Sequence, residues 1–309
     1  MGLLTRRETL TQNITYMAIM AAVNAIFSLI AALVPVASLF LMIVLPLSSA
    51  IVFLFCKHRY YVIYAVATIT LCLLVTIFDM SFTIFYVLPS LITGYLFGLF
   101  IKYKLHAIWS ILITSIAQGL FSALTIPLIN VLFEVNVIDT FKGIMQVTTS
   151  TNVDIIIPTF LFFLALVQMT FSYIVVHFEI NKFGYVINDE PINTTLYSAI
   201  VIGWLVLIIP FAIFLPSGAY LLLALAFYFM FFLIFSHVAQ RNKKTLIAFG
   251  VSLIVFLFLF AFLYPIVPNP LGLLLTGIYP LLVSLVCLAN SLLFMLAHKD
   301  KIKGTGKEK

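Results

Sequence analysis

Charged side chains are scarce in this sequence. Asp, Glu, Lys and Arg make up 8% of the 309 residues, whereas hydrophobic residues make up 64% and the mean hydropathy is +1.24. A soluble domain could not cover so much apolar surface with so few charges, so we expect lipid to be the solvent for most of the chain. Because apolar segments take up most of the chain, it contains no soluble basic domain that could bind DNA or RNA. We therefore expect no nucleic-acid partner, despite a formal net charge of +6.

The sequence also lacks the motifs of many enzymes and pumps. It contains no GxxxxGK[ST] loop, no HExxH and no serine nucleophile elbow. No Asp, Glu, Lys or Arg lies in the middle of an apolar segment, where a coupling charge is usually kept. Cys56, Cys72 and Cys287 stand singly, and the five histidines lie at segment ends without metal-ligand spacing. We expect no enzymatic activity, no cofactor and no metal.

What the sequence does contain is a series of ten apolar segments. Each has roughly the length that spans ~30 Å of hydrocarbon at about 1.5 Å per residue. They predict an all-α, polytopic integral protein of the cell membrane, with membrane lipid as a partner. The segments are 13–34, 37–56, 61–78, 81–101, 107–133, 155–176, 195–215, 219–239, 245–266 and 272–297.

The basic residues between these segments predict the orientation. With the N-terminus inside, fifteen of the sixteen Lys and Arg residues fall on the cytoplasmic side, and only Lys142 falls outside. Such a partition is a strong positive-inside signal. It favours an even number of spans, with both termini in the cytoplasm.

Four regions follow from this topology. The expected boundaries are a six-helix membrane block at 1–182, a cytoplasmic connection at 183–194, a four-helix membrane block at 195–298 and a basic cytoplasmic tail at 299–309. The first block holds nearly all of the polar residues that lie within the membrane, and the second is mostly Leu, Phe, Ile and Ala.

The first apolar segment carries a stripe of small residues. Its members are Ala18, Ala21, Ala22, Ala25, Ser28 and Ala32. Small residues let helices approach closely in lipid, so the stripe predicts a contact either with a helix of the same chain or with a partner subunit. Gly94 and Gly98 in the fourth segment form a GxxxG spacing, for which helix packing is the simplest interpretation.

Polar residues follow one face of the fifth segment. Ser115, Gln118, Ser122 and Thr125 are spaced i, i+3, i+7 and i+10, and the sixth segment carries Gln168 near mid-depth. A buried amide in hydrocarbon needs a hydrogen-bond partner. Either Gln118 and Gln168 bond each other and join two helices, or they form the floor of a pocket that opens outward.

The segment from Glu134 to Asp154 is the only long hydrophilic loop that the charge pattern places outside. Ile138, Phe141 and Met145 could form the apolar side of a short surface helix, which would leave Asp139, Lys142 and Gln146 facing solvent or a pocket mouth. The loop is either a solvated connection or a lid.

Together these residues predict a binding site for a small polar or amphipathic molecule in the outer half of the first block. The expected floor is Gln118 and Gln168, the walls are Ser122, Thr125 and Tyr86, and the lid runs from Asp139 through Lys142 to Gln146. Neutral amides and hydroxyls could orient such a ligand without burying an unpaired charge.

The first block resembles a known family. The features are TRRETLTQNITYMAIMAAVNAIFSLIAALVP at the start, LPLSSA in the second segment and PSLITGYLFGLFIKYK in the fourth. They resemble the YybS-like uncharacterised membrane proteins of Gram-positive bacteria, a family that is similar to the S-components of energy-coupling factor (ECF) transporters. The likeness to S-components covers residues 1–182, and ordinary S-components lack the four later segments.

This resemblance implies a function and partners. It implies a six-helix unit that binds a vitamin-like or metabolite-like nutrient from outside, energised by a separate T-component and ATPase subunits. The AxxxA face that docks the T-component would correspond to Ala18 and Ala22, next to Ala25. The alternative is a scaffold or regulatory protein that keeps the fold without transport and holds another membrane or cytoplasmic protein, or a second copy of itself.

The topology is open to a direct test. Cysteines placed at positions 142 and 243 should react differently with an impermeant reagent in intact cells, because only the first is expected outside. Labelling of position 243 from outside would show that the orientation is wrong.

Overall fold

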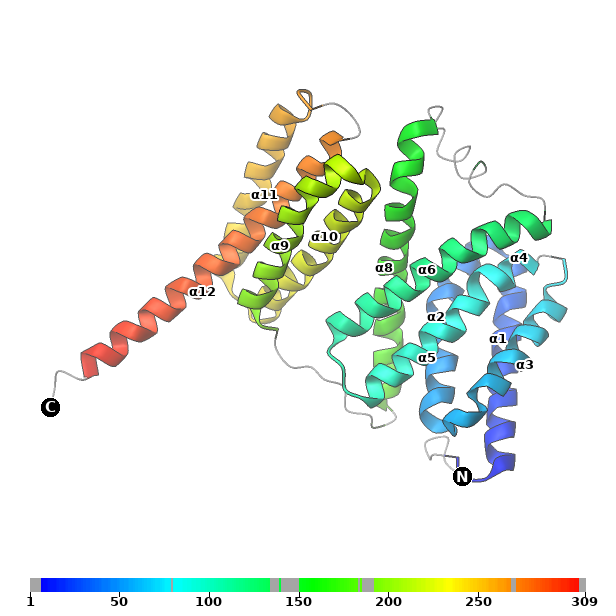
Figure 1. The fold of residues 1–309 in the computed structure, drawn as a ribbon. Helices are drawn as coiled ribbons and strands as arrows, with labels where there is room; N and C mark the ends of the chain where they lie inside the picture. The colour runs from blue at the N-terminus through cyan, green and yellow to red at the C-terminus, as the bar shows by residue number, and fades with distance from the viewer. Residues whose placement is uncertain are drawn as a thin grey trace. The chain divides into compact units, whose positions relative to one another are not determined.

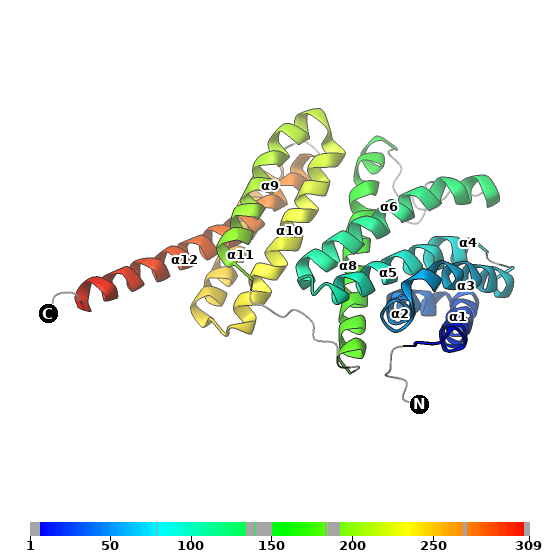
Figure 2. The same ribbon diagram turned by 60° about the horizontal axis from the view of Figure 1, so that its bottom comes forward.

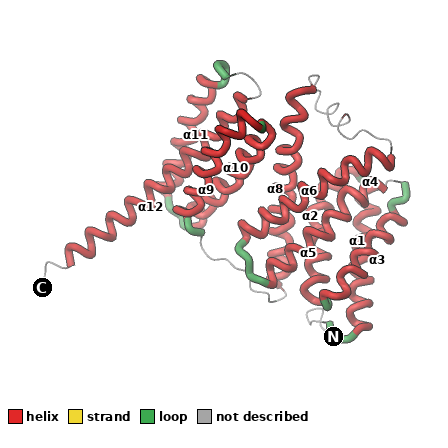
Figure 3. Tube along the Cα trace, viewed as in Figure 1, coloured by secondary structure: helices red, strands yellow, loops and turns green. Residues whose placement is uncertain are grey.

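The computed structural model describes residues 7–78, 80–133, 139, 150–182, 184, 192–267 and 271–305. Within them the chain forms helices and short turns, without a β-strand (Figures 1, 2 and 3). The α-helices are α1 (Leu10–Leu33), α2 (Pro35–Phe55), α3 (Tyr61–Val75), α4 (Met80–Phe82), α5 (Leu88–Lys102), α6 (Ala107–Phe133), α8 (Ser150–Lys182), α9 (Thr194–Phe214), α10 (Pro216–Ala239), α11 (Lys243–Leu263) and α12 (Ile278–Thr305). Three short segments of other helix types complete the set: η1 (His58–Tyr60), η2 (Thr83–Val87) and η3 (Leu271–Gly277).

The lengths and composition of these helices make the chain a multi-pass membrane protein. Nine helical segments among the described residues are long and apolar enough to cross a membrane. The tenth long helix is α2, which has 21 residues. Its stretch Ile43–Phe55 is apolar but shorter than the nine other segments. The prediction of an all-α polytopic protein with about ten spans is confirmed.

Local signals in the sequence explain where several helices begin and end. Thr9 caps α1, because its hydroxyl accepts a hydrogen bond from the Gln12 amide while the Gln12 side chain reaches back to the cap backbone. Val34 is extended because it precedes Pro35, which then opens α2 in its first turn. Pro216 opens α10 in the same way after Leu215, whose backbone is not helical (φ −149°, ψ 79°). Both breaks separate two helices, as the sequence predicts.

Pro89 lies where the helix type changes within one apolar helical stretch, Thr83–Lys102. It is in the first turn of α5, and the preceding segment η2 is π-helical. A proline ring clashes with the carbonyl four residues earlier, and the wider π-turn relieves that crowding. Four other prolines lie inside helices: Pro46, Pro127, Pro158 and Pro210.

The chain divides into two compact units. The first unit comprises residues 1–148 and 160–189, and the second comprises 149–159 and 190–309. The first therefore holds α1 to α6 and most of α8, and the second holds α9 to α12.

In the first unit, α1, α2, α3 and α5 lie side by side (Figures 1 and 2). Two glycines set the distance between α2 and α5. A Cβ atom on Gly94 would overlap the Pro46 carbonyl oxygen and Ser49 Cβ, and one on Gly98 would lie 2.7 Å from the Phe53 ring. The packing interpretation of the GxxxG spacing is confirmed.

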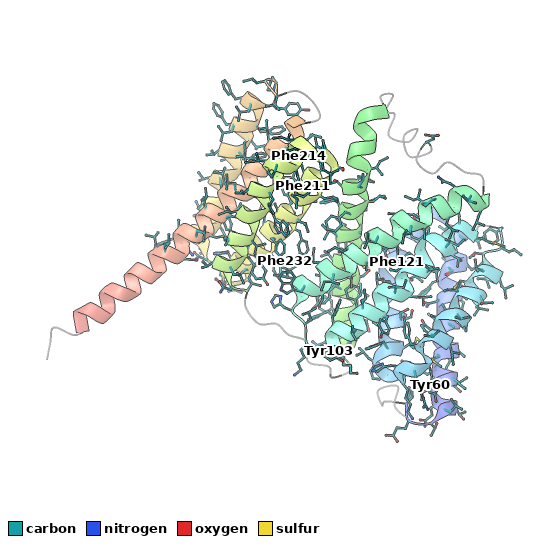
Figure 4. The ribbon with its side chains drawn as sticks, in the orientation of Figure 1. Tyr60, Tyr103, Phe121, Phe211, Phe214 and Phe232 are labelled. Atoms are coloured by element: carbon teal, nitrogen blue, oxygen red, sulfur yellow. The ribbon has the colours of Figure 1, made fainter. Side chains whose placement is uncertain are left out.

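In the second unit, α9 and α10 form a closely packed pair. Phe211 of α9 lies against Gly218 of α10, where a Cβ atom would come within 2.6 Å of its ring (Figure 4). Tyr197 and Phe229 stack between the same helices, with ring centroids 5.8 Å apart. His237 is buried near the end of α10, where its ring meets Phe249 of α11 edge-on.

The α2–α5 contact predicts a sharp difference between two glycine substitutions. Gly94→Ala should destabilise the protein by about 1–3 kcal/mol, because the new methyl group overlaps the α2 backbone. Gly203→Ala is the matched control, since nothing lies within 4 Å of its Cβ position. It should be neutral or stabilising by up to about 1 kcal/mol through helix propensity. Thermal unfolding in detergent measures both, and equal stability of the two variants would contradict the close contact.

Candidate functional site

A hydrogen-bonded polar cluster joins three helices in the interior of the first unit. Asn24 of α1 donates from Nδ2 to the Tyr64 hydroxyl of α3 at 3.0 Å, and its Oδ1 accepts from Ser48 Oγ of α2 at 2.7 Å. Asn24 and Tyr64 are each 1% exposed. Nearby, the Tyr61 hydroxyl donates to the Leu91 carbonyl of α5 at 2.6 Å. These bonds hold four helices together where no water competes for them.

Two further hydroxyls of this cluster have no hydrogen-bond partner among the described residues. Ser49 and Thr68 are fully buried, and both side chains lie near the Tyr64 hydroxyl without completing a hydrogen bond. A buried hydroxyl without a partner loses the hydrogen bonds that it would make in water. The cluster is therefore nearly, but not fully, satisfied by the protein.

This cluster is absent from the expectations drawn from the sequence, although the sequence contains a signal for it. Tyr61, Tyr64, Thr68 and Cys72 are spaced i, i+3, i+7 and i+11, and all four are buried on the same face of α3. Asn24 falls on the buried side of α1. A search for polar residues at helical spacing would have found these residues along with those of the fifth segment.

The predicted polar face of α6 is a buried stripe. Ser115, Gln118, Ser122 and Thr125 are all buried. The Ser115 hydroxyl donates to the Ile111 carbonyl at 2.7 Å and the Thr125 hydroxyl to the Ser122 carbonyl at 2.9 Å. These two hydroxyls thus satisfy their donors within their own helix.

Gln118 is the exception on this stripe. Its side chain is 3% exposed, and Oε1 accepts no hydrogen bond from any described residue. The alternative in which Gln168 donates to this oxygen is therefore not what the structure has. Gln168 is half-buried on α8, and Ser172, one turn further along, is fully buried with an unpartnered hydroxyl.

The helices α6 and α8 meet close to Gln118. A Cβ atom on the neighbouring Gly119 would lie 3.8–4.0 Å from Phe162 and Ala165, which is ordinary van der Waals contact. The residue next to Gln118 in the chain therefore contacts α8, and the second predicted floor residue, Gln168, is one turn beyond Ala165 on α8.

Tyr86 lies in the π-helical segment η2, which packs against both α3 and α6. The ring of Phe85 meets Tyr86 edge-on, with centroids 5.0 Å apart. The Thr76 and Thr83 hydroxyls share a 2.7 Å hydrogen bond that ties η2 to the end of α3. Short π-segments inside helices occur often at functional sites.

The predicted lid lies largely outside the described residues. Asp139 is exposed, whereas Lys142 and Gln146 are not among the residues that the structure describes. Of the predicted floor and walls, Gln118, Ser122 and Thr125 lie on α6, Gln168 lies on α8 and Tyr86 lies in η2. The site as a whole, with its lid, stays a prediction.

The small-residue stripe of α1 divides between two faces. Ala25 is buried in the first unit together with Ala21 and Ser28, whereas Ala18 and Ala22 are exposed. Ala25 therefore packs against helices of the same chain, which is one of the two interpretations of the stripe. Ala18 and Ala22 lie on an outer surface, next to exposed isoleucines.

In the described part of the chain, no three His, Cys, Asp or Glu side chains come close enough together to hold a metal ion. The three cysteines, which are buried, form no disulfide bond.

Residues 22–155 match the family model of a predicted membrane protein, DUF2232. The match runs from α1 to the first residues of α8 and covers less than half of the chain, so it links this part to an uncharacterised membrane family. That description includes no ligand or activity, and the likeness to S-components remains a prediction. No curated protein and no solved structure matches the chain.

The polar cluster predicts that Tyr64→Phe destabilises the protein. Removing the hydroxyl leaves the Asn24 amide without its acceptor in a buried site, which should cost about 1–3 kcal/mol. Tyr103→Phe is the control, because Tyr103 is 69% exposed. Thermal unfolding in detergent should separate the two variants, and an unchanged Tyr64→Phe would mean that the cluster contributes no net stability.

Proposed function

We propose that this protein is the substrate-binding component of a small-molecule transport system. Its first unit would bind a neutral polar or amphipathic molecule between α6, α8 and η2, from the side that the charge pattern places outside the cell. Binding rather than catalysis is the role proposed, with energy supplied by partner subunits.

The observation that carries this proposal is the buried, unpartnered side-chain oxygen of Gln118. A carbonyl oxygen left without a donor in the membrane interior costs about 1–3 kcal/mol. A bound molecule that donates an N–H or O–H group to Oε1 would recover this free energy. The Ser172 hydroxyl of α8 is a second buried polar group without a partner among the described residues.

The residues around this oxygen suggest the chemistry of the ligand. Gln118, Ser122, Thr125 and Gln168 are neutral, and no charged side chain accompanies them on this part of α6 or α8. A ligand with a formal charge would therefore lack a counter-ion. We expect a ligand with at least one hydrogen-bond donor, and an isostere that lacks the donor should bind markedly worse.

Partner subunits would need a docking surface, and α1 offers one. Ala18 and Ala22 are exposed one turn apart, so another helix could approach the α1 backbone closely at this point. A T-component with its ATPases is the partner that the resemblance implies. The four helices of the second unit, which ordinary S-components lack, would be a further element of the assembly.

A second candidate function is a membrane scaffold without transport. The dense α1–α2–α3–α5 packing favours it, because the glycine contacts at Gly94 and Gly98 and the hydrogen bonds of Asn24 and Tyr64 stabilise a rigid unit without a ligand. Such a unit could hold another protein through its basic segments.

One substitution separates the two functions. The full chain, purified from its own membranes in a mild detergent, would be extracted and its small molecules compared by mass spectrometry with those of Gln118→Leu. We expect a molecule that is enriched with the wild type and reduced at least about tenfold in the variant, which corresponds to the loss of a ~1.4 kcal/mol contact. Gln240→Leu is the control, because Gln240 is exposed at the end of α10.

Two results would overturn the proposal in favour of the scaffold. One is an identical set of small molecules in the wild type and in Gln118→Leu. The other is a Gln118→Leu variant more stable than the wild type with no change in any co-purified molecule, because an apolar side chain would then simply remove an unsatisfied oxygen. Stoichiometric co-purification of ATPase subunits would support the transport assembly independently.

A further inference from the structure

Three segments far apart in the sequence meet at one end of the first unit. The Arg7 amide donates to the Phe55 carbonyl at 2.9 Å, and Lys102 Nζ lies 2.8 Å from His58 Nε2. The segment before α1, the turn from α2 through η1 and the turn from α5 to α6 are therefore in contact. They carry Arg7, Lys57, Arg59, Lys102 and Lys104, which we call the basic end, and the only carboxylate in residues 7–9, 57–60 and 102–106 is Glu8.

A buried asparagine fixes two of these segments. Asn13 is fully buried, and its Nδ2 donates to the carbonyls of Arg7 and Thr9 at 3.2 and 2.7 Å. Its Oδ1 accepts from the Lys57 amide at 2.8 Å. Both donors and the acceptor of the amide are thus used to hold the backbone at Arg7 and Lys57. The positive charges of the basic end are held on an ordered backbone.

The third segment places a lysine where glycine is the usual residue. At the end of α5 the Leu105 amide donates to the Phe100 carbonyl at 2.9 Å and the Lys104 amide to the Ile101 carbonyl at 3.1 Å. This is a Schellman motif with Lys104 in the left-handed conformation, at φ 54°. A residue with a Cβ atom is strained in that conformation, and glycine is not.

The same motif recurs at the end of α10. The Asn242 amide donates to the His237 carbonyl and the Arg241 amide to the Val238 carbonyl, with Arg241 at φ 52°. Among the described residues, the two non-glycine residues with positive φ are therefore both basic and both at the glycine position of a Schellman motif. Strain of this kind is retained where the side chain itself has a use.

The surroundings of the basic end identify what the charge would meet. The helix α3 begins directly after Arg59 and Tyr60, and its residues Val62, Ile63 and Val66 are 59–69% exposed. In a membrane, acyl chains cover that surface, so the headgroups of the same lipids lie at the level of the basic end. Tyr60 and Tyr103 lie at this end as well (Figure 4), as is typical of residues at a membrane interface.

We propose that the basic end binds the headgroups of anionic phospholipids, and that Lys104 is kept in a left-handed position because its charge contributes to this binding. Lys and Arg are the side chains that bind phosphate groups, Arg in a bidentate manner and Lys as a point charge. Binding to the folded surface alone would stabilise the protein increasingly, with a logarithmic dependence, as the lipid concentration rises.

The test uses the full chain in a neutral detergent, with its thermal midpoint measured in added phosphatidylglycerol or phosphatidylcholine. The thermal midpoint of the wild type should rise more with phosphatidylglycerol than with phosphatidylcholine. Lys104→Gly should unfold about 2–4 °C higher than the wild type without lipid, because the strain is removed. The same variant should lose at least about half of the increment from phosphatidylglycerol. A more stable protein that responds less to lipid is not expected from a purely structural lysine.

Two other variants complete the test. The first is a double variant, Lys102→Gln with Arg59→Gln. Its thermal midpoint should rise less with phosphatidylglycerol than that of the wild type, and without lipid it should be no more stable than the wild type. If Lys104→Gly fails to fold, the double variant tests the proposal. Lys182→Gln is the matched control, because Lys182 is an exposed lysine paired with Glu179 at 2.6 Å and lies outside the basic end. Its thermal midpoint should rise with phosphatidylglycerol as much as that of the wild type.

Three results would overturn the proposal. The first is an equal response of the wild type to the two lipids. The second is a full phosphatidylglycerol increment in a folded Lys104→Gly variant or in the double variant. The third is a shift of the thermal midpoint with inorganic phosphate or polyglutamate, at the same charge concentration, that equals the shift with phosphatidylglycerol. That result would indicate binding of anions in general and not of a lipid.

Discussion

The close approach of α2 and α5 at Gly94 is the contact on which the first unit depends. Lipid tails are as apolar as leucine, so helices in a membrane gain little from hydrophobic burial against each other and associate through close packing and hydrogen bonds. The absence of a Cβ atom at Gly94 lets the Pro46 carbonyl and Ser49 reach the α5 backbone. The hydrogen bonds from α3 to Leu91 and Ser48 are made within this packed group of helices.

Two kinds of buried polar group can be told apart in this unit by counting their hydrogen bonds. Asn24 and Tyr64 are paired within the protein and act as cross-links between helices. Gln118 has the same burial but an oxygen that the described residues leave unpaired. Polarity alone therefore does not mark a binding site in a membrane protein. An unsatisfied group on a face of otherwise satisfied ones is the more informative sign.

The approximate number of long apolar helices, the breaks at Pro35 and Pro216 and the close packing at Gly94 could all be predicted from the sequence. These features depend on local chemistry: apolar length, the missing amide of proline and the missing side chain of glycine. The Asn24–Tyr64 hydrogen bond could not be predicted from the sequence, because it depends on how three helices are rotated about their axes. The same reason explains why Ala22 and Ala25, three residues apart in one predicted stripe, lie on different surfaces.

The π-helical segment before Pro89 has a consequence for how proteins of this kind can diverge. A π-turn holds one residue more than an α-turn, so the chain before it is rotated by about 100° relative to an uninterrupted α-helix. The direction in which Tyr86 and Thr83 are presented thus depends on the number of residues in η2 as well as on their identity. Loss of a single codon there would turn this edge of the unit to new neighbours while the α5 contact with α2 stayed intact. Short insertions and deletions in this segment would accordingly change which side chains this edge presents, a change that aligned substitutions would not reveal.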